Sequence, residues 1–221
     1  IGITVNLLEA LKNTHTKILL VGSADEYGIV KDNENPISEA NSFRPTNPYA
    51  VSKIAQDFLG LQYFLSHGMN IVRVRPGNQI GPMQRPDFVV AAFAEQIAKA
   101  EYGYMDPIIN VGNLESIRDF TDVRDMVDAY VLAILHGKIG EVYNLGSQKG
   151  IKIREILDKL INLAKIKFEV RIDPARNRPA DTPKLIIDSS KFRNLTGWKP
   201  KISIDHSLED ILDYWRLSVK K

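Results

Sequence analysis

The sequence has 221 residues, of which 44% are hydrophobic and 25% charged, a composition typical of a globular chain with a substantial core. Its net charge of +2 gives no electrostatic case for binding nucleic acid, and no apolar run approaches the roughly 20 residues of a membrane span. Without cysteine the chain has no disulfide or thiolate chemistry, its four scattered histidines predict no metal site, and no signal-peptide pattern opens the sequence, so a cytoplasmic location is expected.

Helix and strand patterns alternate along the first part of the chain. Residues 1–12 have the apolar spacing of an amphipathic helix, and residues 17–22 form an apolar run typical of a buried parallel strand. A long turn-rich segment follows at 29–46. A second helix is predicted over 48–68 and a second strand over 70–75. This alternation predicts an α/β fold with a parallel sheet.

The second helix carries its own start and stop signals and a pair of functional side chains. Asn47 can cap its first turn, Pro48 suits its first position, and Gly68 is well placed for a left-handed C-cap. Tyr49 and Lys53 are four residues apart, so they lie on the same face of this helix.

Ser23, at the end of the first strand, completes a candidate catalytic group with Tyr49 and Lys53. Catalytic groups in open α/β sheets sit at the carboxyl ends of strands. An ammonium group near a phenol lowers the tyrosine pKa from about 10, and a serine hydroxyl can hold a substrate oxygen while the proton moves. These three side chains suit a reaction that forms or reduces a carbonyl group by hydride transfer. Taken alone, the tyrosine–lysine spacing would also fit a surface pair.

The remainder of the chain opens with a loop rich in glycine and proline at 76–82 and then continues the mixed pattern. Helices are expected at 87–101, 122–136, 151–164 and 205–216, and strands at 107–112, 141–145 and 168–172.

Several motifs carry a family resemblance. Residues 23–28 match Ser/Thr-x-x-x-Tyr-Gly, 49–53 match Tyr-x-x-x-Lys and 118–125 match Arg-Asp-Phe-x-x-Val-x-Asp, with shorter matches at 143–146, 178–179 and 197–200. In these motifs and their order the chain resembles the extended short-chain dehydrogenase/reductase family, the NAD-dependent epimerases and dehydratases that act on nucleotide sugars.

The resemblance implies a fold and a domain organisation. It implies a doubly wound parallel sheet of the Rossmann type, N-terminally truncated, with a smaller interleaved α/β substrate lobe. Residues 1–75 and 122–145 are then the remaining part of the dinucleotide-binding domain, and residues 76–121 and 146–221 form the substrate-binding lobe.

The glycine-rich phosphate loop of dinucleotide-binding folds has no match in this sequence. In the family, a helix like that at 1–12 comes just before the serine-bearing strand, so roughly the N-terminal third of a family member is missing here. We therefore expect strand 17–22 to pair within the chain only with strand 70–75, leaving one row of its backbone groups without an intrachain partner.

The resemblance also implies roles for individual residues. NADP or NAD is the expected cofactor, and its implied contacts are Tyr49, Lys53, Pro76 and Asn78. A nucleotide-sugar substrate carries a diphosphate, which needs fixed cations or hydrogen-bond donors. The implied substrate-binding residues are Asn78, Arg85, Arg118, Arg178 and Asp181.

The turn after Ser23 bears on the reaction type. Dehydratases of the family usually carry Thr, an acidic or serine residue and then Glu, whereas this chain has Ala24, which cannot transfer a proton, and Asp25, a shorter carboxylate that could still be catalytic. The local sequence is most similar to GDP-4-keto-6-deoxy-D-mannose reductases, so we expect NAD(P)H-dependent reduction of the C4 keto group of a GDP-linked sugar. The alternatives are a GDP-mannose 4,6-dehydratase or another nucleotide-sugar epimerase or dehydratase, and a non-catalytic fragment or partner subunit.

Family members commonly dimerise by pairing the tyrosine-bearing helix and the helix before it across a two-fold axis. Both helices of this chain continue their apolar pattern beyond the catalytic residues. A homodimer with residues 1–12 and 50–66 at the interface is therefore expected.

Overall fold

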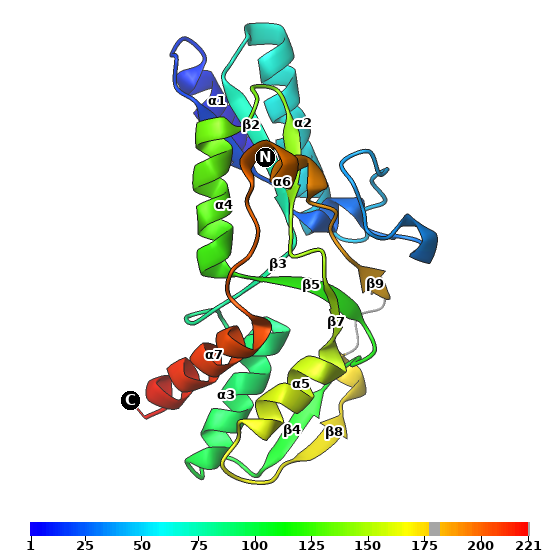
Figure 1. Cartoon of the computed structure of the whole chain (residues 1–221), viewed down its shortest axis with the longest axis vertical. Helices are drawn as coiled ribbons and strands as arrows, with labels where there is room; N and C mark the ends of the chain where they lie inside the picture. Colours follow the sequence, from blue (N-terminus) through cyan, green and yellow to red (C-terminus); the bar gives the residue numbers. More distant parts are fainter. Residues whose placement is uncertain (177–181, 221) are drawn as a thin grey trace.

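The computed structural model describes residues 1–176 and 182–220, and these form two regions stacked along the long axis of the molecule (Figure 1). One region is built on a parallel sheet covered by helices. The other packs three helices against short strands. The elements of the parallel-sheet region are α1 (Gly2–Leu11), β1 (Ile18–Val21), α2 (Pro48–His67), β2 (Ile71–Pro76), α4 (Val123–His136), β6 (Val142–Leu145) and α6 (Ser190–Thr196).

The parallel sheet has β2 at its centre, with β1 on one side and β6 on the other. Ile18 pairs with Ile71 at the start of the first ladder, and Arg73 pairs with Val142 in the second. Within the described residues β1 pairs with β2 alone, as the sequence predicts, so its outer edge is open. The predicted parallel α/β class is confirmed.

Helices cover both faces of this sheet, which makes it doubly wound. On one face α1 and α2 bury Leu8 and Tyr63 against Leu20 of β1. On the other face α4 buries Met126 against Val72 of β2. The alternating side chains of each strand thus contact different helices, as expected for a sheet that is buried on both faces.

The ends of α2 follow the sequence signals. The Asn47 side-chain oxygen accepts a hydrogen bond from the Ala50 N–H (2.8 Å), Pro48 occupies the first turn, and Gly68 ends the helix with φ +63°, in the left-handed region. The start of this helix is therefore fixed by local sequence, and with it the positions of the residues in its first turns.

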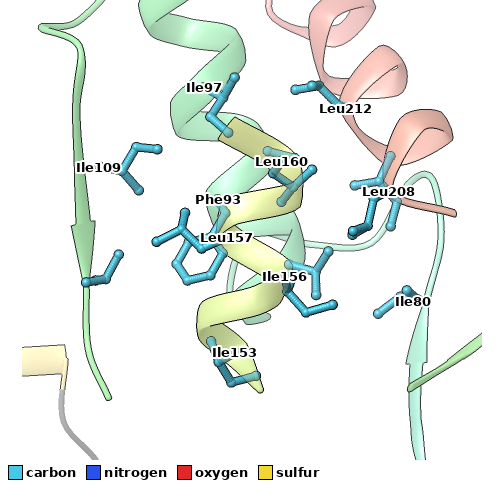
Figure 2. Packing of buried hydrophobic residues seen from close by; sticks show 14 of the residues in the cluster. Ile80, Phe93, Ile97, Ile109, Ile153, Ile156, Leu157, Leu160, Leu208 and Leu212 are labelled. Carbon is cyan, nitrogen blue, oxygen red and sulfur yellow. The ribbon is translucent and has the colours of Figure 1, made fainter. Parts of the chain in front are cut away.

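The second region has a core of its own between α3, α5 and α7 (Figure 2). Phe93 and Ile97 of α3, Leu157 of α5 and Leu208 and Leu212 of α7 lie in it. The elements of this region are β3 (Asn78–Ile80), α3 (Val89–Glu101), β4 (Ile108–Val111), β5 (Ile117–Asp122), β7 (Gly150–Lys152), α5 (Ile153–Asn162), β8 (Glu169–Ile172), β9 (Lys184–Leu185) and α7 (Ile204–Ser218).

Several short elements were not expected from the sequence. The segment 76–82, predicted as a loop, contains β3, which pairs in parallel with β5. Strand β5 buries three polar residues, Asp119, Thr121 and Asp122, beside Phe120, so no apolar period marks it. The buried Asp119 carboxylate is satisfied instead by hydrogen bonds from neighbouring loop groups, including the N–H and hydroxyl of Ser147.

The domain boundaries proposed from the sequence stay a prediction. Phe192 and Trp198 belong to the segment assigned to the substrate lobe, and they pack with Val72 and Met126 in the core of the parallel-sheet region. The two regions are thus joined by the chain after β9 as well as by β2 and α4.

Candidate active site

The turn after β1 presents Ser23 at the carboxyl end of the strand. The Ser23 hydroxyl oxygen accepts a hydrogen bond from the Asp25 N–H (3.2 Å), and Glu26 Oε1 accepts one from the Ser23 N–H (2.8 Å). This reciprocal pair is a capping box, and it starts the 3-10 helix η1 (Ala24–Tyr27). The side chain of Ser23 is therefore held by the same bonds that shape the turn.

The first turns of α2 bring Tyr49 and Lys53 to this strand end. Lys53 Nζ donates a hydrogen bond to the Val21 carbonyl oxygen (2.8 Å) and one to Gln56 Oε1 (3.3 Å). It lies 5.8 Å from the centroid of the Tyr49 ring. The lysine thus ties the helix to the last residue of β1, next to Ser23.

Tyr49 faces Ser23 and remains 53% exposed. Partial burial raises the pKa of Tyr49 above its ordinary value of 10, a hydrogen bond with Ser23 opposes this, and the negative charges of Asp25 and Glu26 raise the pKa further. Because burial and the two carboxylates outweigh the hydrogen bond with Ser23, the pKa of Tyr49 is raised, whereas the sequence predicted that Lys53 would lower it. The Tyr49 phenol therefore keeps its proton at neutral pH and can act as an acid.

A cavity of about 350 Å³ lies in the second region, beside β3 and β5. Its size is at the lower end of the range for small-molecule sites. Apolar groups and a few polar ones line it together, including Asn78, Arg118, Phe88, Asn110 and Asn113. A cationic side chain among amides and an aromatic ring is a suitable setting for a phosphorylated ligand with a planar group.

The structure places some of the sequence-predicted residues in or near these two features. Asn78 and Arg118 line the cavity. Pro76 is the last residue of β2 and is buried, whereas Asp25 is exposed in the turn beside Ser23. Asp25 and Pro76 thus lie at the carboxyl ends of β1 and β2, whereas Asn78 and Arg118 lie at the cavity of the second region, and the roles of all four stay predictions.

Of the remaining predicted residues, Arg85 is described by the structure and does not line the cavity. The Arg85 side chain is 80% exposed and pairs at the surface with Asp87, which itself lines the cavity. Arg178 and Asp181 lie outside the described residues. The assignment of all three to substrate binding therefore stays a prediction.

Sequence reasoning missed several residues that line the cavity. Arg176 precedes the predicted Arg178 by only two residues, Asn110 lies on β4, and Asn113 and Ser116 follow β4 in the segment that precedes Arg118. A search for polar residues close to the predicted arginines would have found Arg176 and Ser116. Nothing in the sequence marks Asn110, because the strand pairing that places it there is not visible locally.

Comparison with known proteins assigns the family. The sequence model of the GDP-mannose 4,6 dehydratase family matches residues 2–211. The chain belongs to this family. The resemblance stated from the sequence motifs is thereby confirmed, and the Rossmann-type fold agrees with the solved structures described next.

Curated relatives include reductases and dehydratases of nucleotide sugars. The chain is 40% identical to GDP-6-deoxy-D-mannose reductase from Pseudomonas aeruginosa over 220 residues, which cover 99% of this chain and 72% of that protein. It is 27% identical to the human dTDP-D-glucose 4,6-dehydratase, over 90% of this chain and 56% of the relative. The chain thus spans only part of each relative.

Solved structures agree with the fold over nearly all of the chain. The structure of RMD from Pseudomonas aeruginosa complexed with NADPH matches with a TM-score of 0.92 and 38% identity, over 97% of this chain and 72% of that one. UDP-glucuronic acid 4-epimerase from Bacillus cereus, in complex with UDP-glucuronic acid and NAD, matches with a TM-score of 0.87 and 27% identity. The match covers 99% of this chain and 67% of the epimerase chain.

The described residues offer neither a metal-binding cluster nor a membrane-spanning helix. Residues 1–176 and 182–220 contain no cluster of three or more His, Cys, Asp or Glu side chains that could hold a metal ion. Among the helices of this part of the chain, none is long and apolar enough to cross a membrane.

Proposed function

We propose that this chain carries the catalytic and sugar-nucleotide sites of an NAD(P)H-dependent reductase that converts the C4 keto group of GDP-4-keto-6-deoxy-D-mannose to a hydroxyl group. The observation that carries the proposal is the Ser23–Tyr49–Lys53 group at the carboxyl end of β1, in a chain 40% identical to a GDP-6-deoxy-D-mannose reductase. The cavity around Arg118 supports a phosphorylated substrate.

The described residues fit the reactive end of a nicotinamide cofactor. Tyr49 is half exposed beside Ser23, so a ligand at the sheet end can approach both hydroxyl groups. The sequence contains no glycine-rich phosphate loop, so the fit concerns the nicotinamide end of the cofactor alone. When bound, NAD(P)H supplies the hydride that is transferred to C4.

The chain's own residues then handle the proton. As hydride reaches C4, the ketone oxygen gains negative charge, and the Ser23 hydroxyl donates a hydrogen bond that holds it. Tyr49 gives its proton to this oxygen, which completes the alcohol and leaves a phenolate. Lys53, held to β1, keeps a positive charge near the ring, and the exposed phenolate regains a proton from water.

GDP-mannose 4,6-dehydratase activity is the alternative, and the family model is named for it. Loss of water from the hexose needs an additional acid–base group at the turn after Ser23. Ala24 has no such group, and Asp25 is the one exposed carboxylate in that turn, since Glu26 is buried. The composition of this turn favours reduction over dehydration.

Two incubations of the full-length protein separate the reactions. A reductase consumes NADPH when GDP-4-keto-6-deoxy-D-mannose is supplied, and it leaves GDP-mannose unchanged when no reduced cofactor is added. A dehydratase regenerates its own cofactor and forms the 4-keto-6-deoxy product from GDP-mannose alone. Formation of that product would overturn the proposed reaction.

The proposal includes a homodimer that works in the cytoplasm. Exposed apolar side chains lie along α1 and α2, among them Ile3, Val51, Phe58 and Leu65. A monomer would leave them in water, whereas a two-fold pairing of these helices would bury them.

A further inference from the structure

Next to the Ser23–Tyr49 pair lies a buried group of four charged side chains. Glu26 is fully buried, and Asp57, Arg73 and Arg75 are at most 7% exposed. Asp57 follows Tyr49 on α2 by eight residues, a little more than two turns later. Charges buried this deeply persist only when they are paired and hydrogen-bonded, so their contacts define what the group does.

Arg75 joins the two elements that carry the catalytic hydroxyl groups. Its Nε donates a hydrogen bond to Asp57 Oδ2 (2.6 Å) and lies 3.2 Å from Glu26 Oε2, and Arg73 pairs with the other oxygen of Asp57. Asp57 belongs to α2 with Tyr49, whereas Glu26 belongs to η1 with Ser23 as its cap. One guanidinium therefore fixes the position of η1 relative to α2.

The two carboxyl oxygens of Glu26 have different hydrogen-bonding environments. Oε1 accepts the Ser23 N–H (2.8 Å), and a Cβ at Gly22 would stand 2.2 Å from this oxygen, so the backbone leaves room for the carboxyl group. Oε2 receives no hydrogen bond from the described residues, because the Arg75 Nε–H points to Asp57. A proton held between Glu26 and Asp57 would satisfy it.

We propose that Glu26 is a positioning residue for the reaction: it holds the Ser23 turn against the tyrosine-bearing helix, and its charge controls how readily Tyr49 gives up its proton. The inference rests on the proposed reductase function for its kinetic consequence. Its physical content, a link between the Glu26 carboxyl group and the Tyr49 phenol, is independent of the substrate.

The environment of Glu26 gives the direction of the effect. Burial and then the negative charge of Asp57 raise the pKa of Glu26 to about 7, against the lowering effects of the Ser23 N–H and Arg75. The elements packed here, α2, β2 and η1 itself, carry the titratable groups Tyr49, Lys53, Asp57, Arg73, Arg75, Asp25 and Tyr27, together with Tyr63 and His67 in the last two turns of α2.

Above this pH the carboxylate is charged, and its charge raises the pKa of Tyr49. A phenol with a raised pKa donates its proton less readily. Proton donation by Tyr49 should therefore slow as the pH rises through about 7.

The variant Glu26→Gln isolates the charge. Glutamine keeps the shape, its oxygen can accept the Ser23 N–H, and its amide can donate to Asp57, so it mimics the protonated acid. We expect kcat of the full-length wild-type protein to fall as pH rises through about 7, and kcat of the variant to stay at the low-pH value.

Glu26→Ala should lower kcat by roughly tenfold at every pH while KM is kept, and Glu26→Gln should restore the kcat that the alanine variant loses.

Glu34→Gln is the matched control, because Glu34 pairs with Arg44 in the following loop, outside this charged group. It should keep the wild-type pH profile. Identical pH profiles for wild type and Glu26→Gln would overturn the inference.

A second readout needs no substrate. The pKa of Tyr49 can be measured from the absorbance of phenolate, as the difference between each protein and the same protein carrying Tyr49→Phe. Glu26→Gln should lower the pKa of Tyr49, since a nearby negative charge is removed, whereas a purely structural role would leave it unchanged. An unchanged phenol pKa rejects the link. If instead the wild-type protein fails to reduce the sugar, the proposed function fails, and this titration still decides the role of Glu26.

Discussion

Tyr49 and Ser23 come from different elements, and each is positioned by bonds that the sequence indicates in part. The start of α2 is fixed by the Asn47 cap, and Ser23 is itself a cap of η1. The cap of α2 was expected from the sequence, the cap of η1 was not, and the catalytic roles of both residues stay predictions. The burial of Glu26 beside Arg75 in the same turn was not predicted, because the sequence motif gives no sign of it.

Arg118 is the described arginine from the predicted substrate site that lines the cavity. We expect Arg118→Met, which keeps the length of the stem, to weaken the binding of GDP by about tenfold or more, because hydrogen bonds to charged groups contribute about 1.5–3 kcal/mol. Calorimetric titration of the full-length protein with GDP measures this. Binding of NADPH should be unaffected.

The matched control for this prediction is Arg171→Met. Arg171 lies on β8, is 57% exposed, and pairs with Glu169 outside the cavity. The substitution Arg171→Met also removes one positive charge, so the affinity for GDP should stay within about a factor of two of the wild-type value. Equal affinities for wild type and Arg118→Met would show that the cavity does not receive the diphosphate.

At the scale of elements, one buried ion pair joins α3 to α7. Arg216 Nε and Nη2 donate to the two oxygens of Glu101 (both 2.8 Å), and Nη2 also donates to the Leu163 carbonyl oxygen after α5. The Glu101 side chain is 3% exposed. Burial alone would raise the pKa of Glu101, but the hydrogen bonds from Arg216 and the Lys165 N–H hold it below its ordinary 4.5.

Glu101→Gln should lower the free energy of unfolding by about 2 kcal/mol at pH 7, because Arg216 then loses its charged partner in a buried position. A carboxyl group with a lowered pKa stabilises the folded state above its ordinary pKa, and this contribution is lost as pH falls. The difference between wild type and variant should therefore shrink below pH 4.5. Denaturant unfolding at several pH values measures it.

Asp213→Asn tests whether an exposed partner of Arg216 contributes as much to stability as the buried Glu101. Asp213 accepts from the same arginine (3.0 Å), but its side chain is 68% exposed. An exposed pair contributes little, so this variant should change stability by less than about 1 kcal/mol. A loss as large as that of Glu101→Gln would contradict the argument from burial.

Elements with a clear apolar period were predicted, and those without one were missed. The helices α2, α4 and α7 and the strands β1, β2 and β6 match expected segments. By contrast β5 is rich in polar residues and β7 is short and largely exposed, and they form because distant segments pair with them. The cavity lies beside β5 and the equally unpredicted β3, so its lining could not be derived from local sequence.

At the scale of the whole molecule, β1, α1 and α2 lie together in the parallel-sheet region (Figure 1). Within the described residues the outer edge of β1 has no strand partner, and α1 and α2 carry exposed apolar side chains. Leu65 of α2 is 70% exposed. If α1 and α2 form the dimer interface, Leu65→Asp places a charge there and should convert the full-length protein from dimer to monomer. Sedimentation velocity distinguishes the two species.

Leu217→Asp is the matched control for this prediction, because Leu217 on α7 is 65% exposed and lies in the other region. It should leave the dimer intact. A wild-type protein that sediments as a monomer would contradict the proposed assembly, as would loss of the dimer in the Leu217 variant alone.

The central claim, that Tyr49 protonates the reduced sugar, is tested most directly by Tyr49→Phe in the full-length protein. The substitution removes one hydroxyl group that is hydrogen-bonded to Ser23, and it keeps the ring on a half-exposed site. We expect turnover of GDP-4-keto-6-deoxy-D-mannose with NADPH to fall by about a hundredfold or more, with the binding of GDP and NADPH retained. Turnover close to that of the wild type would show that another group donates the proton.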